Sequence, residues 1–283
     1  MLAWLVARSS GADFLLRWED LDTTADPRHE TAQLADLSAL GIDFDPPVMR
    51  QSERLREYQG IVDELTTGGL TYRCWCSRRE VREAAAAPHG RVGTYPGTCR
   101  RLSTTQIAHH ERSDRRPALR LRSDNSEVTA VDSLHGPVSM GMDDIVIQRG
   151  DGTPAYNLVV VVDDHVQGVA EVVRGDDLLP STPRHVYLQR LLGFNEPRWT
   201  HVPLVTDEHG DRLAKRDGSA GLDEWHRAGG STQSLLTAFG QSFGMHVDDA
   251  TTVADLLPGF SPAAVPLRPA MFMSDGPRLS LAH

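Results

Sequence analysis

The 283-residue chain has little lysine, little cysteine and no long apolar run. No apolar stretch approaches the roughly 20 residues that cross a bilayer, and the opening segment reaches Arg8 with no small-residue cleavage pattern behind it. We therefore expect a cytoplasmic protein with no membrane partner. A content of 40% hydrophobic and 24% charged residues excludes collagen-like and disordered classes and favours a globular protein.

The three cysteines are Cys74, Cys76 and Cys99. Their odd number and the Cys-x-Cys spacing of the first two disfavour a disulfide framework. Three thiolates suit Zn²⁺, which takes four ligands in a tetrahedron, and Tyr95 or His89 can supply the fourth. The alternative is three reduced cysteines without a metal, which behave as small apolar residues.

The net charge of −10 disfavours a general nucleic-acid coat, but the charge is unevenly distributed. Residues 73–122 contain twelve arginines and four acidic residues, a local charge of +8, which leaves −18 for the rest of the chain. The same segment contains every cysteine. A basic, cysteine-bearing segment is a candidate for contact with RNA or DNA.

Lys215 is the single lysine among 29 basic residues. It lies in a glycine-flanked basic loop at 212–218, after a strand-like stretch at 201–205. Three cations in five residues suit a polyphosphate, for which an arginine is a poor substitute when a compact charge is needed. The alternative is a solvated surface loop.

Helical and strand patterns alternate in the first part of the chain, which predicts an α/β fold. We expect a helix over 1–9 that stops at Gly11, a strand over 14–18, and helices over 28–40 and 52–67 joined through a connection at 43–47.

Residues 72–116 have little hydrophobic periodicity and read as an irregular insert that a metal can hold together. Short strands are expected at 118–122, 128–131, 138–140 and 145–148, then a strand or helix buried on both sides at 156–162. Helices are expected at 183–192, 222–227 and 231–243, and a poorly ordered tail from 258 to 283.

One basic and three acidic side chains lie at the carboxyl end of the first predicted strand, in the sequence Arg17, Trp18, Glu19, Asp20, Leu21, Asp22. Open α/β sheets bind ligands at the carboxyl ends of their strands, where a carboxylate can hold a substrate ammonium group. The alternative is a solvated acidic turn that caps the next helix.

Two further apolar runs end in polar residues. The first ends in Asp163, Asp164 and His165, and the second continues into Arg174, with Asp176 and Asp177 beyond it. Arg174 has the planar fork that binds a carboxylate through two hydrogen bonds. The alternative is a structural ion pair between Arg174 and a neighbouring acid.

Seven motifs occur in a fixed order: RWEDLD, C-x-C, YPGTC, YNLVVVVDDHVQGV, VVRGDDL, HVPLV and RLAKR. Together they resemble the catalytic domain of glutamyl-tRNA synthetases, and within that family most closely the branch that acts on queuosine in tRNA(Asp). The resemblance runs from residue 1 to about 245. It implies a class I synthetase Rossmann-type parallel sheet, truncated at its N-terminus, with a zinc-containing insert and a short C-terminal helical region.

The implied organisation is a first Rossmann half over 1–72, a basic zinc-binding insert over 73–116 and a second Rossmann half with a KMSKS-like loop over 117–220. A helical region over 221–257 and a tail over 258–283 follow. The resemblance implies that glutamate is activated with ATP and Mg²⁺ and moved to the queuosine of tRNA(Asp), by a protein expected to be a monomer.

The resemblance also implies a role for single residues. Glu19 resembles the residue that holds the glutamate amino group, Tyr156 lines that pocket, and Arg174 resembles the partner of the side-chain carboxylate. Lys215 matches the second lysine of the KMSKS-type loop and, with Asp177, is expected at ATP. The implied zinc ligands are Cys74, Cys76, Tyr95 and Cys99, with His89 as the fallback for the tyrosine.

The sequence departs from the family pattern in two places. Arg212 and Ala214 replace the first lysine and the serine of the loop, and the arginine keeps the charge. No strand and turn with a HIGH motif precede the first helix. A translation start upstream of Met1, an inactive paralogue and a fragment are the three explanations of this second departure.

Two other functions remain open on the sequence. One is charging of the tRNA acceptor end, although the roughly 65 residues after the basic loop are too few for the helical anticodon-binding domain of the ordinary enzyme. The other is a catalytically inactive, zinc-stabilised RNA-binding protein that uses the basic segment, whose RNA affinity would fall steeply with salt.

Overall fold

The computed structural model describes residues 1–21, 27–85, 94–206, 209, 222–227, 229–245, 247, 250–273 and 278–281. Five residues discussed above, Asp22, His89, Arg212, Ala214 and Lys215, lie outside this described part. None of the described helices is long and apolar enough to cross a membrane.

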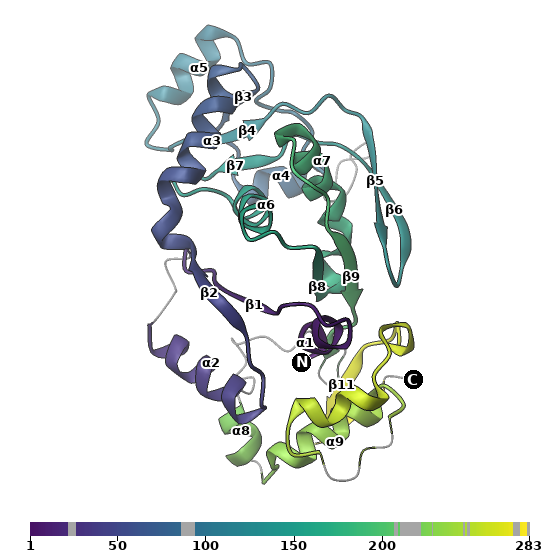
Figure 1. The fold of residues 1–283 in the computed structure, drawn as a ribbon. Helices are drawn as coiled ribbons and strands as arrows, with labels where there is room; N and C mark the ends of the chain where they lie inside the picture. Colours follow the sequence, from purple (N-terminus) through teal and green to yellow (C-terminus); the bar gives the residue numbers. More distant parts are fainter. Residues whose placement is uncertain are drawn as a thin grey trace.

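The described helices lie around several small sheets (Figure 1). The α-helices are α1 (Leu2–Ser9), α2 (Pro27–Ala39), α3 (Leu55–Thr67), α4 (Arg78–Ala85), α5 (Thr104–Glu111), α6 (Tyr156–Val166), α7 (Thr182–Leu192), α8 (Leu222–Arg227) and α9 (Thr232–Ser242). Short 3-10 helices are η1 (Gln51–Arg54), η2 (Asp176–Ser181), η4 (Val253–Gly259) and η5 (Pro262–Ala264).

The described strands form four hydrogen-bonded groups. These groups are β1 (Leu15–Trp18) with β2 (Asp45–Arg50); β3 (Thr71–Cys74), β4 (Ala118–Leu121) and β7 (Val146–Gln148); β6 (Gly136–Gly141), β5 (Glu127–Asp132), β9 (Arg198–Val202) and β8 (Glu171–Gly175); and β10 (Val205–Thr206), β11 (Ala270–Met273) and β12 (Arg278–Leu281). The pairs β1–β2, β5–β9, β8–β9 and β10–β11 are parallel. The expected α/β class with parallel pairing is confirmed, but the parallel strands belong to several sheets.

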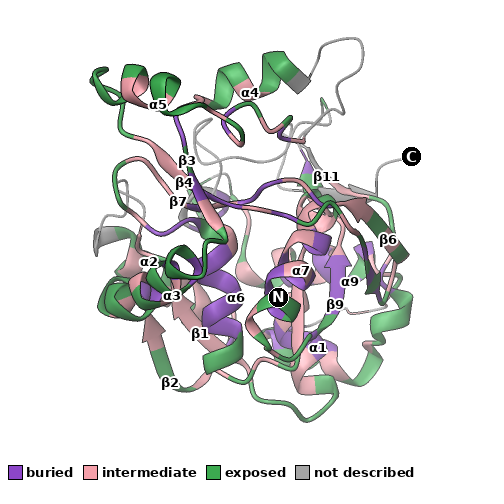
Figure 2. Cartoon of the chain, turned by 90° about the horizontal axis from the view of Figure 1, so that it is seen from above, coloured by how far each residue is buried: buried purple, intermediate pink, exposed green. Residues whose placement is uncertain are grey.

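The apolar run at 156–162 forms the helix α6, in the buried interior of the molecule (Figure 2). Its seven residues from Leu158 to Asp164 are all buried. A helix that is apolar on every side is packed on every side, and α6 contacts α3, α7 and β7. The helix α7 ends at Leu192 and is followed by Gly193, whose φ of +69° suits a glycine at a helix C-terminus.

The first helix packs on the C-terminal part of the chain. Trp4 and Leu5 of α1 are buried with Leu236 and Phe239 of α9 and with Leu256 of η4. Burial of a large apolar side chain contributes about 1.5–3 kcal/mol, so these residues fix α1, which also contacts β8. The turn after α1 is thereby held near the strands that carry the site.

Three expectations from the sequence are wrong. The stretch at 43–47 was expected to be a connection, yet β2 begins at Asp45 and pairs with β1. Its two prolines are tolerated because β2 is an edge strand. The expected irregular insert contains α4 and α5, and the expected poorly ordered tail contains β11, which pairs with β10.

Candidate active site

Arg174 lies at the carboxyl end of β8 and has three neutral hydrogen-bond partners. Its Nε donates to Nε2 of His201 at 3.0 Å, its Nη1 lies 3.1 Å from Nδ1 of His185, and its Nη2 donates to the Thr182 hydroxyl at 2.9 Å. The guanidinium also lies over the indole of Trp199, 5.0 Å from the ring centroid. Among the described residues no carboxylate forms an ion pair with it.

The charge of Arg174 is poorly compensated. Burial lowers the pKa of Arg174, and Tyr156, Asp164 and Asp177 raise it. A guanidinium nevertheless stays protonated in proteins, so this end of β8 holds a permanent cation that is largely removed from water. Within the described part of the chain, the alternative of a structural ion pair is wrong. The arrangement favours an anionic ligand.

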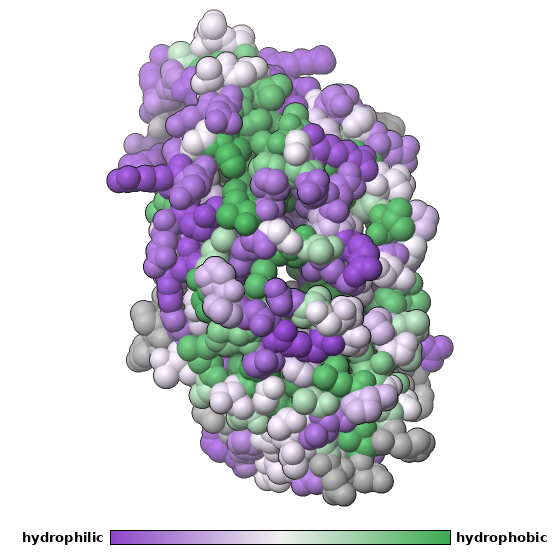
Figure 3. Space-filling view, in the orientation of Figure 1, coloured by the Kyte–Doolittle hydropathy of each residue, from purple (hydrophilic) through white to green (hydrophobic). Residues whose placement is uncertain are grey.

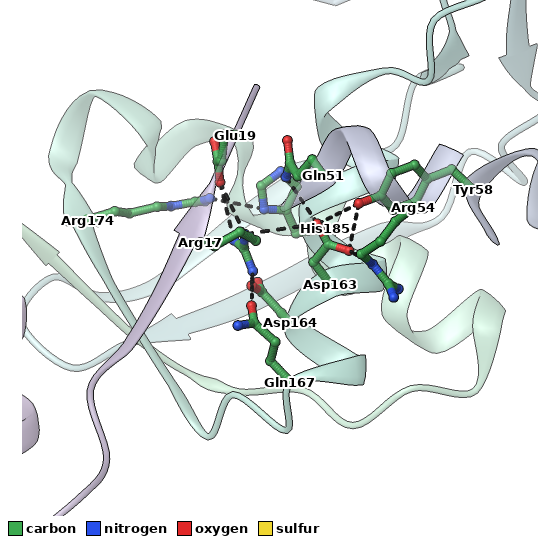
Figure 4. Close-up of polar contacts among 10 residues, drawn as sticks. All are labelled: Arg17, Glu19, Gln51, Arg54, Tyr58, Asp163, Asp164, Gln167, Arg174 and His185. Atoms are coloured by element: carbon green, nitrogen blue, oxygen red, sulfur yellow. Dashed lines mark hydrogen bonds and ion pairs between the residues drawn. The ribbon is translucent and has the colours of Figure 1, made fainter. Parts of the chain in front are cut away.

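Glu19 follows β1 and is held by Arg17 (Figure 4). Nη2 of Arg17 donates to a Glu19 carboxylate oxygen at 3.3 Å, while Nη1 donates to Asp164 at 2.8 Å and to Gln167 at 3.0 Å. Arg17 therefore bridges β1 and α6 and fixes the direction of Glu19. The Glu19 side chain stays 45% exposed, so its carboxylate retains acceptor sites for a ligand.

Tyr156 lies near both charged groups, Glu19 and Arg174. It is the first residue of α6, is 47% exposed, and its ring centroid lies 6.0 Å from that of His185. Burial raises the pKa of Tyr156, Arg174 lowers it and Glu19 raises it. The phenol thus lies within electrostatic range of both charges, and Figure 4 shows the Glu19 and Arg174 side chains directed toward the same region. Figure 3 shows the molecular face hollowed near its centre, where Figure 1 places β1, α6 and β8.

Behind this site lies the fully buried carboxylate of Asp163. It accepts hydrogen bonds from the Tyr58 hydroxyl at 2.9 Å, Nε2 of Gln51 at 3.1 Å and Nε of Arg54 at 3.0 Å. Nε of Arg17 lies 4.0 Å away. The Asp163 carboxylate therefore connects α6 to α3 and η1 inside the protein.

Replacing Asp163 with alanine is expected to lower the free energy of unfolding by about 3–5 kcal/mol, because it leaves the Arg54 charge without its buried partner. Urea titrations monitored by circular dichroism measure the difference. The control is Glu64→Ala on the exposed face of α3, for which a change below about 0.5 kcal/mol is expected. Equal effects of the two variants would contradict the assignment.

His185 makes stability depend on pH. Burial, with Arg174, His201 and Arg184, lowers the pKa of His185 from 6.5 to about 3. Between these values the unfolded chain binds a proton that the folded chain does not. The contribution of this group is therefore fully present above pH 6.5 and is lost as the pH falls from 6.5 towards 3. Melting temperatures should fall more steeply over this range for the parent chain than for His185→Gln; parallel curves would contradict this.

Asp177 lies in η2, directly after β8, and Lys215 lies outside the described residues. A Cβ added to Gly175 would meet a carboxylate oxygen of Asp177 at 2.7 Å and Leu204 at 2.8 Å. Gly175 therefore allows Asp177 to fold back on the end of β8. Asp177 lies at the same strand end as Arg174. That Asp177 and Lys215 both lie at the ATP site stays a prediction.

The cysteines form a second site, on the insert. The sulfur atoms of Cys74, Cys76 and Cys99 lie within 4.8 Å of one another. The Tyr95 hydroxyl oxygen lies 3.3 Å from Sγ of Cys74 and 3.9 Å from Sγ of Cys76. Four ligands around a tetrahedral zinc with Zn–S bonds of about 2.3 Å stand about 3.8 Å apart. The four donor atoms therefore fit a metal ion.

The charged groups around this cluster also favour the binding of a metal ion. Nε of Arg120 donates to Sγ of Cys74 at 3.3 Å, and its guanidinium carbon lies 3.6 Å from the Tyr95 ring centroid. The hydrogen bond from Cys99, helped by Tyr95 and Arg120, lowers the pKa of Cys74 to about 4 in spite of its burial. A thiolate, not a thiol, is the metal ligand, so the cluster is prepared to bind a cation.

Sequence reasoning missed the residues that hold Arg174. His185 and His201 are both fully buried, and neither was given a role from the sequence. His201 was noted as part of a strand-like stretch and as the first residue of the motif HVPLV. A polar side chain in a strand-like stretch identifies no partner, so neither signal predicted the contact with Arg174.

Three comparisons place the chain among known proteins. The family model described as tRNA synthetases class I (E and Q), catalytic domain, matches residues 1–256. The chain is 50% identical over 276 residues to the glutamyl-Q tRNA(Asp) synthetase of Nocardia farcinica, covering 98% of this chain and 88% of that protein. It is 40% identical over 291 residues to that of Nitratidesulfovibrio vulgaris, covering 97% and 90%.

Solved structures show the same fold at lower identity. The glutamate tRNA ligase of Elizabethkingia meningosepticum matches with a TM-score of 0.72 and 22% identity over 99% of this chain. The glutamate-tRNA synthetase of Elizabethkingia anophelis matches with a TM-score of 0.74 and 23% identity over 96%. The chain spans 62% and 64% of these two proteins. With the family match over residues 1–256, the chain belongs to the class I tRNA synthetases for glutamate and glutamine, a family of ligases.

Proposed function

We propose that this protein activates glutamate with ATP and transfers the glutamyl group to the queuosine base in the anticodon of tRNA(Asp). The observation that supports the amino-acid part is the Arg174 cation, which neutral groups hold and which forms no ion pair among the described residues, with the exposed Glu19 carboxylate close by (Figure 4). A ligand with an ammonium group and a side-chain carboxylate matches both charges. The name glutamyl-Q tRNA(Asp) synthetase, carried by relatives at 40–50% identity, supports the RNA part.

In this proposal the side chains act by positioning. Glu19 accepts hydrogen bonds from the glutamate ammonium group, and Arg174 binds the side-chain carboxylate through its two remaining N–H groups. Tyr156 covers the chain between them. The glutamate α-carboxylate is then held for attack on the α-phosphorus of ATP, where the bond to pyrophosphate breaks and glutamyl adenylate forms.

Lys215 and Asp177 serve the ATP side of the proposed site. The Lys215 ammonium stabilises negative charge that develops on the phosphates, and Asp177 lies at the strand end where ATP would bind. Mg²⁺ bound with ATP neutralises further phosphate charge. In the transfer step a hydroxyl of the queuosine cyclopentenediol attacks the adenylate carbonyl, and AMP leaves.

Cys74, Cys76, Cys99 and Tyr95 would hold zinc on the insert. Zinc supplies folding free energy there, since a structural site has four protein ligands and no open position. The role of these residues is to shape the basic insert, which we propose contacts the tRNA. RNA binding through this surface is expected to weaken steeply with salt.

The test is glutamate-dependent exchange of pyrophosphate into ATP, followed by transfer of labelled glutamate to RNA. We expect exchange with glutamate and not with glutamine or aspartate, and transfer to tRNA(Asp) that contains queuosine. Transfer to the acceptor end of tRNA(Glu) would support the ordinary charging reaction instead. A folded, metal-loaded protein that binds RNA and shows no exchange would support the inactive RNA-binding protein.

Replacing Lys215 with alanine is expected to slow glutamate-dependent exchange about 100-fold or more, since a fixed cation at the phosphates acts mainly in the transition state. The melting temperature should not change. Lys215→Arg keeps the charge and should retain more activity than the alanine variant. Equal exchange rates in the parent and Lys215→Ala would remove this residue from the mechanism.

A further inference from the structure

A layer of buried side chains lies behind Arg174 and contacts neither glutamate nor ATP in the proposed reaction. His201 and His185 are both 0% exposed, and Asp132 is 3% exposed. They come from three elements: β9, α7 and β5. The parallel register of β8 and β9 pairs Arg174 with His201, which places the imidazole against the guanidinium.

Asp132 is ionised in this arrangement. One of its carboxylate oxygens accepts the backbone N–H of His201 at 2.9 Å and lies 2.6 Å from Nδ1 of His201. The other accepts the backbone N–H groups of Leu134 and His135, both at 3.0 Å. Although burial raises the pKa of Asp132, these hydrogen bonds lower it below its usual range. A carboxylate with four donors around it is an acceptor only.

The protonation of His201 follows from its two charged neighbours, and the Thr182 hydroxyl, 3.1 Å from Nε2, can donate to that same nitrogen. Nδ1 must carry the proton, because the Asp132 carboxylate can only accept. Nε2 must be bare, because the Nε of Arg174 donates to it at 3.0 Å and a guanidinium has no acceptor. His201 is thus neutral, in one tautomer, and burial accordingly lowers its pKa.

The same reasoning fixes His185. Its Nδ1 faces Nη1 of Arg174 at 3.1 Å and is therefore bare, and its Nε2 carries the proton towards the amide oxygen of Asn157 at 3.0 Å. Arg174 is consequently held by two neutral imidazoles and one hydroxyl. Three of its five N–H groups are used, and one remains on each terminal nitrogen.

We infer that Asp132, His201 and His185 are positioning residues that fix the Arg174 fork with neutral acceptors, so that the site takes a carboxylate side chain and rejects the corresponding amide. This inference rests on the proposed function. A carboxylate accepts hydrogen bonds from both remaining N–H groups of Arg174. An amide accepts only one of them through its oxygen, and its NH₂ group, itself a donor, faces the other N–H group. A carboxylate in place of either imidazole would neutralise Arg174 and remove this preference.

Variants of His201 separate positioning from simple structural support. His201→Asn lacks an acceptor at the Nε2 position, whereas His201→Gln carries its amide oxygen near that position. We expect His201→Asn to raise the KM for glutamate about tenfold or more, with a smaller change in kcat, and to reduce the preference for glutamate over glutamine. His201→Gln should restore much of both. The control is His29→Gln, at an exposed position on α2.

A second readout does not need activity. Nitrogen spectra of ¹⁵N-histidine protein, assigned with the His201→Gln variant, should show His201 protonated at Nδ1 and bare at Nε2 at pH 7. Asp132→Asn should shift the proton towards Nε2. A His201 that is protonated at Nε2 or cationic in the parent chain would overturn the inference.

The outcomes distinguish the inference from the proposed function. If the parent chain neither binds nor activates glutamate, the proposed function fails and the inference fails with it. If the parent chain prefers glutamate and His201→Asn keeps the same KM and the same preference, the inference alone fails. Melting curves of each variant show whether a loss of activity is due to unfolding. If His201→Asn does not fold, recovery of the glutamate KM and of the glutamate preference in His201→Gln supports the inference, and a folded His201→Gln without this recovery contradicts it.

Discussion

A Cys99→Ala variant is expected to lose its bound zinc, from about one equivalent in the parent chain to almost none, and to unfold the insert locally. The reason is geometric: the sulfur atoms of the cluster lie within 4.8 Å of one another, and the Tyr95 oxygen lies 3.3 Å and 3.9 Å from two of them. A structural zinc contributes about 10–16 kcal/mol in small metal-held folds. Elemental analysis and hydrogen exchange over residues 73–116 measure the two effects.

The matched control is Leu102→Ala. Leu102 packs against the cysteine cluster but offers no ligand, so this variant should keep its zinc while losing some packing. Tyr95→Phe keeps the ring beneath Arg120 and removes only the oxygen. It is expected to weaken zinc binding about tenfold or more. An unchanged zinc content in Cys99→Ala would contradict the proposed ligands. An unchanged zinc affinity in Tyr95→Phe would mean that His89, not Tyr95, is the fourth ligand.

The sequence predicted the parts of the site that occur at the ends of apolar runs. Glu19 follows β1, and Arg174 is the last residue but one of β8. Strand ends of this kind meet at one edge of an α/β fold, so the meeting of these side chains was predictable. Tyr156 was predicted from the resemblance alone, since its apolar run fitted a strand and a helix equally well. The valines of this run favour a strand. In the structure the run forms the helix α6 instead, and this helix is buried on all sides.

The parts that escaped prediction depend on contacts between distant residues. His201 is 27 residues from Arg174 along the chain and 69 from Asp132. Only the pairing of β8 with β9 and of β5 with β9 brings them together, and no local pattern encodes that pairing. The strand β2 was missed for the opposite reason. Its prolines are a strong local signal for a loop, which pairing with β1 overrides.

A chain with Arg174→Ala is expected to activate glutamate with a kcat/KM about 1,000-fold lower than the parent chain. Two charge-assisted hydrogen bonds to the substrate carboxylate are lost, each worth about 1.5–3 kcal/mol. Arg174→Lys keeps a charge but not the fork, so an intermediate loss is expected. Exchange assays at several glutamate concentrations measure the ratio.

Glutamate binding should also appear in stability, because a ligand that binds only the folded chain raises the melting temperature by mass action. We expect millimolar glutamate to stabilise the parent chain and to leave Arg174→Ala unchanged. Arg190→Ala is the control, since Arg190 lies on α7 in an exposed ion pair with Glu196 and has no part in the site. The cation of Arg174 has no anionic partner among the described residues, so the substrate itself supplies the missing charge. If Arg174→Ala and Arg190→Ala responded alike to glutamate, the carboxylate would have to bind elsewhere.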